Sequence, residues 1–186
     1  MANKVKFGFK NAYYATIDES GDTITYGTPK RLEGAVSMTL SASGDDVEFY
    51  ADDSLYFGES VNNGYEGSLE LALVPEDFKK DVLGEVLDSN NVLVEDATVS
   101  PKPFALLCEF TANDGAIKYA FYRCTAKRPN LEGTTKGATK EVKTETLDLM
   151  IRPRNDGKVK VSTVNLTDTT VINNWYTEVY EETVSA

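Results

Sequence analysis

Alternation of apolar and polar residues with a period of two is the feature that most limits how this chain folds. Between residues 32 and 42 the even positions are apolar or small and the odd positions are mostly polar, and a second copy runs from 65 to 73. This period is typical of strands with one buried face. We therefore expect the two segments to pair as antiparallel strands, whose polar sides form one exposed surface carrying Glu33, Glu66 and Glu70.

A β-hairpin is expected over residues 104–125, because two strand-like segments flank an Asp-Gly pair. With this pair as the loop, Phe110 lies opposite Tyr119, and the register leaves one consistently apolar face. The same register places Cys108 and Cys124 on opposite faces of the hairpin, so we predict two free thiols.

Helix is scarce in the pattern. A proline followed by acidic residues opens a helix of about ten residues, with Phe78 and Val82 on its buried side. Near the C-terminus, the apolar spacing over 172–179 is typical of an amphipathic helix, with Asp168 or Thr170 as its N-cap. We expect both helices to pack against the strands.

These patterns predict a mainly β fold, a β-sandwich or barrel with a flanking α-helix and a short C-terminal helix, in a single domain spanning 1–186. An extended loop at about 43–64 interrupts the pattern. Long loops in compact domains are usually functional, and large aromatic side chains favour burial, so we expect this loop to contact a partner. Its acidic and aromatic residues are Asp45, Asp46, Phe49, Tyr50, Asp52, Asp53, Tyr56 and Phe57.

The net charge of −11 is concentrated in one segment. No Lys or Arg occurs between Arg31 and Lys79, whereas eleven acidic residues lie there. Nucleic-acid binding requires a basic surface that neutralises phosphates, so this class of function is excluded.

Catalytic and metal sites lack their usual residues. The chain has no His, which excludes a Ser-His-Asp triad and His-ligated metals, and its two Cys are too few for a structural zinc site. The acidic residues of the loop do not follow the spacing of an EF-hand, and no pair of strand glutamates is singled out as a glycosidase pair. We expect no enzyme activity, catalytic residue, cofactor or metal, and no membrane span, since no apolar run approaches the required length.

Seven sequence blocks, in order along almost the whole chain, resemble the major tail proteins of long-tailed phages of Gram-positive bacteria, the subunits of the tail tube. The blocks are 4–11 (KVKFGFKN), 49–53 (FYADD), 63–67 (NGYEG), 81–84 (DVLG), 102–107 (KPFALL), 144–147 (TETL) and 153–159 (PRNDGKV). Each block is short, and their order and spacing together carry the resemblance.

The resemblance implies a tail-tube fold that forms hexameric rings, which stack into a tube through which DNA passes during ejection. In such a virion tail, assembled in the host cytoplasm, the partners are other copies of the chain and other tail proteins, and the loop at 43–64 reaches the next ring. Our hypothesis is that Glu33, Glu66 and Glu70, together with Glu109, face the lumen, where acidic groups repel phosphate.

Two alternatives remain. A monomeric carbohydrate-binding β-sandwich would use Trp175 and tyrosines to stack on sugars. The tube protein of a related contractile or secretion system would share the tail-tube fold.

Overall fold

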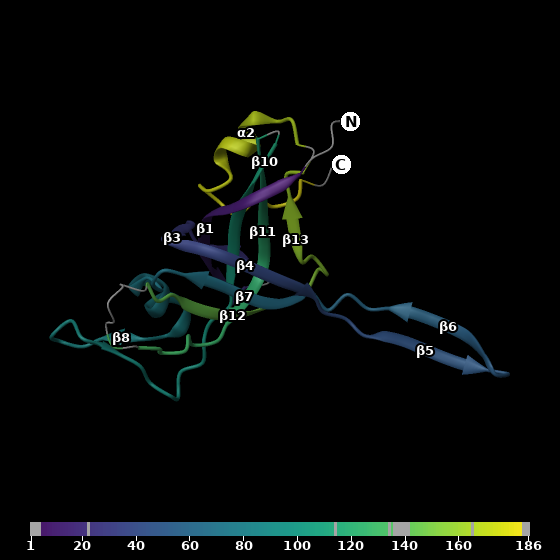
Figure 1. Ribbon diagram of the computed structural model, residues 1–186, viewed down its shortest axis with the longest axis horizontal. Helices are drawn as coiled ribbons and strands as arrows, with labels where there is room; N and C mark the ends of the chain where they lie inside the picture. The colour runs from purple at the N-terminus through teal and green to yellow at the C-terminus, as the bar shows by residue number, and fades with distance from the viewer. Residues whose placement is uncertain are drawn as a thin grey trace.

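The computed structural model describes residues 5–21, 23–113, 115–133, 135, 142–164 and 166–183. Strands dominate these residues, and helix is confined to short segments (Figure 1). The strands are β1 (Lys6–Asp18), β2 (Thr25–Tyr26), β3 (Lys30–Leu32), β4 (Ala35–Ala42), β5 (Asp46–Ala51), β6 (Ser54–Ser60), β7 (Tyr65–Leu71), β8 (Val86–Leu87), β9 (Leu93–Val94), β10 (Phe104–Ala112), β11 (Gly115–Ala126), β12 (Glu145–Ile151) and β13 (Lys160–Ser162). The helical elements are α1 (Glu76–Phe78), η1 (Lys79–Leu83) and α2 (Thr169–Asn174). The predicted mainly β fold with short helices is confirmed.

One large sheet wraps around the main core. Its strand order is β2-β1-β10-β11-β12-β7-β4, and β3 and β13 pair with β1 and β11. Buried side chains of β1, β10 and β11 meet those of β7 and β12 in this core, which α1 and η1 complete with Phe78, Val82 and Leu83. A smaller cluster on the other face of β10 and β11 lies beneath the C-terminal segment and contains Trp175 and Tyr122.

The predicted pairing of the two alternating segments is confirmed, because β4 and β7 are antiparallel with Thr39 opposite Ser68. Gly67 permits their close approach, since a Cβ atom there would lie 1.8 Å from the carbonyl oxygen of Thr39. The first segment is not one continuous strand as expected. A turn at Glu33 and Gly34, with a φ of 76° at the glycine, separates β3 from β4.

The hairpin of β10 and β11 forms with a register two residues from the predicted one. Phe110 pairs with Ile117, not with Tyr119, and the inward face is unchanged because the shift is even. A bulge between Leu106 and Phe104 then shifts the register by one residue and pairs Phe104 with Cys124. Residues of β11 beyond the bulge therefore point to the opposite face from the one predicted. The prediction that the cysteines lie on opposite faces is therefore wrong: both thiols are buried in the main core, and both are free.

The predicted central helix is confirmed and is shorter than expected, whereas the helix predicted over 172–179 ends at Asn174, so Trp175, Tyr176 and Val179 of its apolar stripe lie outside it. Phe78 and Val82 are buried, but α1 passes directly into the π-helical turn η1. Asp168 caps α2 by accepting a hydrogen bond from the Thr170 backbone amide at 2.8 Å. α2 ends at Asn174, and the chain continues as a non-helical segment that buries Val179.

Candidate functional site

The stretch predicted as an extended loop is a β-hairpin, which we call the arm: β5, β6 and the turn between them. β5 and β6 pair only with each other among the described strands and project away from the body of the molecule (Figure 1). The turn residues Asp52 and Asp53 both have positive φ, 50° and 57°. This is the geometry of a type I′ turn, which matches the twist of a hairpin and which Asp tolerates better than most residues.

The arm exposes large apolar side chains that have no core to enter. The exposed fractions are 57% for Phe49, 62% for Tyr50, 76% for Tyr56 and 50% for Phe57. Phe49 and Tyr56 touch edge to face with ring centroids 6.3 Å apart, so part of the apolar surface forms one patch. Contiguous exposed apolar surface of this kind marks an interaction site.

The root of the arm is firmly connected to the sheet. The Val61 amide donates to the Asp45 carbonyl at 3.0 Å, and the Ser43 amide donates to the Gly64 carbonyl at 2.9 Å. Arg152 donates from Nη1 to the Asn63 carbonyl at 3.2 Å and forms an ion pair through Nη2 with Glu66 at 2.7 Å. The guanidinium group thus fixes the point at which the arm leaves the body.

The outer face of β4, β7 and β12 is polar, as the alternation predicts, and we call it the polar face. Its residues are Ser37, Thr39 and Ser41 on β4, Glu66, Ser68 and Glu70 on β7, and Thr146, Asp148 and Met150 on β12. Arg152 lies at its margin, where Glu66 neutralises it. The face therefore presents hydroxyl and carboxylate groups to its surroundings.

Glu70 is held ionised near one end of this face. Its carboxylate accepts a hydrogen bond from Thr144 Oγ1 at 2.6 Å and another from Ser37 Oγ at 2.7 Å. These two bonds lower the pKa of Glu70, and the larger effect comes from Thr144. Glu33, by contrast, lies exposed in the turn before β4, beyond the paired strands.

The structure separates Glu109 from the other three acids, which corrects the prediction that it shares their surface. Like Glu66 and Glu70 its side chain points away from the main core, but on β10 this side carries the smaller cluster, and Glu109 is only 5% exposed because the C-terminal segment covers it. The carboxylate accepts hydrogen bonds from Asn11 Nδ2 at 2.8 Å and from Tyr176 Oη at 2.9 Å. Lys10 and Lys118 approach it to 3.4 and 4.0 Å. Glu109 is the centre of a buried polar network.

Sequence reasoning missed this network because its members come from β1, β10, β11 and the segment after α2. Lys118 also donates to the Ile172 carbonyl at 2.8 Å, which ties α2 to the sheet. Burial lowers the pKa of Lys118, and the nearby carboxylate of Glu109 opposes that shift. No periodic pattern in the sequence indicates a contact between residues that lie so far apart in the chain.

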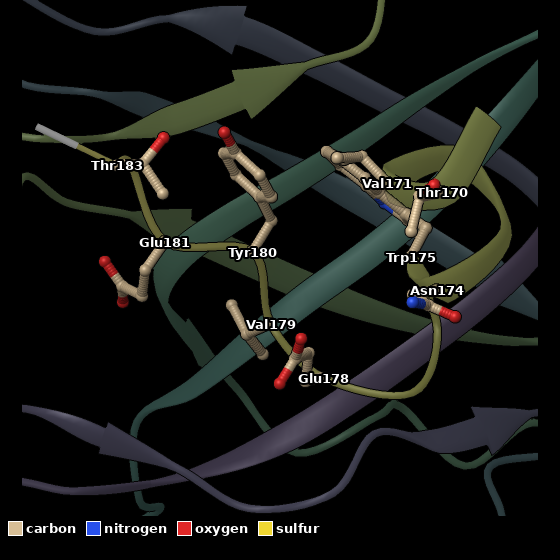
Figure 2. A pocket seen from close by; sticks show the side chains of 9 residues that line it. All are labelled: Thr170, Val171, Asn174, Trp175, Glu178, Val179, Tyr180, Glu181 and Thr183. Atoms are coloured by element: carbon tan, nitrogen blue, oxygen red, sulfur yellow. The ribbon is translucent and has the colours of Figure 1, made fainter. Parts of the chain in front are cut away.

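A hollow of about 410 Å³ lies over the C-terminal segment, and all its lining residues belong to α2 and the extended chain after it (Figure 2). Trp175 lines it but is only 2% exposed and stacks on Tyr180, with centroids 5.8 Å apart. The indole therefore packs in the smaller core and does not offer a free ring face, which a sugar-stacking site requires.

Among the described residues, no group of three or more Asp, Glu or Cys side chains is arranged to hold a metal ion. In the same residues, no helix has the length and apolar character needed to cross a membrane. The arm and the polar face are the features that call for a functional explanation.

No protein-family model matches the sequence, and no curated protein matches it. Among solved structures, a chain described as a type six secretion system protein is similar, with 14% sequence identity and a TM-score of 0.39. That similarity covers 82% of this chain and 92% of the other. The function is therefore inferred from the surfaces of the chain itself.

Proposed function

We propose that this chain is a structural subunit of a phage-type tail tube, which assembles with copies of itself into rings that stack around a conduit for DNA. The exposed arm is the main observation that supports this proposal. A hairpin that projects from the body with four exposed aromatic side chains is unfavourable in water unless another molecule covers it. A second copy of the chain supplies that cover in an assembly.

The free edge of the sheet supports lateral assembly. β4 pairs with β7 on one side and ends the described strand order on the other. An unpaired edge presents free backbone amide and carbonyl groups, to which a strand of a neighbouring copy adds directly. Rings of copies with paired edges leave no such edge exposed.

The polar face suits the inner wall of a DNA conduit. Basic side chains on such a wall would hold the phosphates of DNA by releasing counterions, whereas carboxylates repel them. Glu66 and Glu70 lie on this face among serines and threonines, and Arg152 at its margin is paired with Glu66. DNA that passes such a wall stays hydrated and is not bound.

Removal of the arm tests the proposal. Deletion of residues 46–60 joins Asp45 to Val61, whose backbones are already hydrogen bonded at 3.0 Å, so the body of the subunit stays folded. We expect the concentrated wild-type protein to form rings or tubes by negative-stain electron microscopy and the deletion variant to remain monomeric. The double variant Asp52→Asn, Asp53→Gly is the matched control, because it keeps a type I′ turn and hence the arm.

Assembly of the arm-deleted chain into tubes of normal length would contradict this role for the arm. The lumen is tested separately with Glu66→Lys and Glu70→Lys, introduced into phage or into assembled tubes. We expect slower DNA passage, because each added lysine attracts phosphate. Unchanged ejection from tubes that carry both substitutions would show that the polar face is not the lumen wall.

A further inference from the structure

An open groove of about 420 Å³ lies between the two halves of the sheet. One wall is formed by β4 and the start of β7, with Met38, Leu40 and Tyr65, and the other by β10 and β11, with Phe110 and Tyr119. These side chains are the partly buried margin of the main core. The floor is therefore apolar and aromatic, and its volume is within the range of pockets that enclose a ligand.

Two lysines stand over this aromatic floor. Lys6 Nζ lies 4.9 Å from the ring centroid of Phe110 and 5.8 Å from that of Tyr119, and Lys160 Nζ lies 4.5 Å from that of Tyr65. No carboxylate lines the groove, and in the described part of the chain neither lysine forms an ion pair. The groove thus combines apolar surface with positive charge that has no anionic partner among the residues that the structure describes.

We infer that this groove receives the arm of a second copy of the chain, an inference that rests on the proposed function. Residues 46–60 of the arm contain five acidic residues and no basic residue, together with the exposed aromatic side chains. Acidic groups beside large rings are the chemical complement of lysines above an aromatic floor. The arm points away from its own body, and no arm residue lines its own groove (Figure 1).

The pairing of arm and groove sets the symmetry of the assembly. The two surfaces are different, so in a ring or stack each copy offers its arm to one neighbour and its groove to another. Such head-to-tail contacts generate closed rings when the rotation closes, and continuous stacks when it does not. A closed twofold dimer forms instead only where two copies exchange arms reciprocally, each arm entering the other copy's groove.

Disulfide trapping tests the contact directly. The two native cysteines are both 0% exposed, so they do not compete with introduced thiols. The variants Tyr56→Cys on the arm and Lys160→Cys at the groove are mixed at assembly concentration and oxidised. We expect a disulfide-linked heterodimer, identified by mass spectrometry of the cross-linked peptides. The control partner for Tyr56→Cys is Val92→Cys, a residue that is 56% exposed and outside the groove.

Charge reversal supplies the second readout. Lys6→Glu with Lys160→Glu places acidic groups opposite an acidic arm, and we expect the concentration needed for assembly to rise about tenfold or more. Lys102→Glu, at an exposed position outside the groove, is the matched control and leaves this concentration unchanged. Circular dichroism checks that each variant is folded.

The two proposals fail in different ways. Wild-type protein that stays monomeric at every concentration contradicts the proposed function, and the docking with it. Wild-type protein that assembles, while the groove variant assembles equally well or the cross-link is no more frequent than with Val92→Cys, overturns the docking alone.

Discussion

Glu109 allows the sharpest test of how the C-terminal segment is held on the sheet. Its carboxylate is buried, accepts hydrogen bonds from Asn11 and Tyr176, and lies 4.0 Å from Lys118 Nζ. Replacement by Ala removes the only anion of this network within the described residues: it takes the acceptor from the Asn11 amide and the Tyr176 phenol and leaves the Lys118 ammonium with the Ile172 carbonyl but no counter-charge. A buried group left without its partner is among the costliest of single changes.

The magnitude follows from these contacts. Breaking a buried ion pair by removing one partner costs about 3–5 kcal/mol, so we expect Glu109→Ala to lower the free energy of unfolding by about 4 kcal/mol. For a chain of this length that corresponds to a fall in Tm on the order of 10 °C. Glu109→Gln keeps the shape and one acceptor, and should cost about 2 kcal/mol, the value of hydrogen bonds to a charged group.

Urea unfolding followed by tryptophan fluorescence measures both variants, because Trp175 reports on the cluster next to the network. Glu178→Gln is the control: it changes an exposed glutamate of the same segment and is expected within about 0.5 kcal/mol of wild type. A double-mutant cycle with Tyr176→Phe should give a coupling energy of about 1–2 kcal/mol. A loss below about 1 kcal/mol for Glu109→Ala would refute the buried network.

Three further predictions concern other parts of the molecule. Phe49→Ser with Tyr56→Ser should abolish assembly and leave the Tm of the free chain unchanged, because both rings are exposed before assembly; light scattering and calorimetry check this, and a lowered Tm would contradict it. Tyr14→Phe should cost about 1 kcal/mol at pH 7. Burial opposes ionisation of Asp81, but hydrogen bonds from Lys30 and from the Tyr14 hydroxyl outweigh it and lower the pKa of Asp81. This stabilisation is present above the unfolded-state pKa of about 4 and is lost as the pH falls through the folded-state value, so the difference between variant and wild type should shrink by pH 3 in urea titrations. Finally, burial raises the pKa of both cysteine thiols, so neither should react with a thiol reagent until the chain unfolds; rapid modification of the native protein would contradict their burial.

The sequence predicts those parts of the fold that depend on a regular period. Thr39 and Ser68 share a face because strand side chains alternate, and Phe78 and Val82 share a helical side because they are four residues apart. A bulge breaks this alternation, and no residue pattern in the sequence marks its position. For this reason the sequence does not predict that Cys124 enters the same core as Cys108.

The arm was missed as a hairpin for a different reason. Its turn is Asp52-Asp53, without the glycine that usually marks a type I′ turn, and neither of its strands has a face that is buried in the chain. The groove was missed because Lys6 and Lys160 lie on strands from opposite ends of the chain. Only the wrapped sheet brings them to one opening, so no spacing in the sequence reports on it.

The arm has a consequence for the fidelity of assembly. A two-stranded ladder without a core behind it is only marginally stable, so we expect its amides to exchange hydrogen rapidly in the free chain and slowly in the tube. Ordering such a segment on contact consumes part of the binding free energy, which makes each single contact weak and quick to dissociate. A misplaced subunit held by one arm is then released, whereas a subunit held by several neighbours at once is retained. In the tube that we propose, marginal local order in the arm would thus act as a proofreading step during growth.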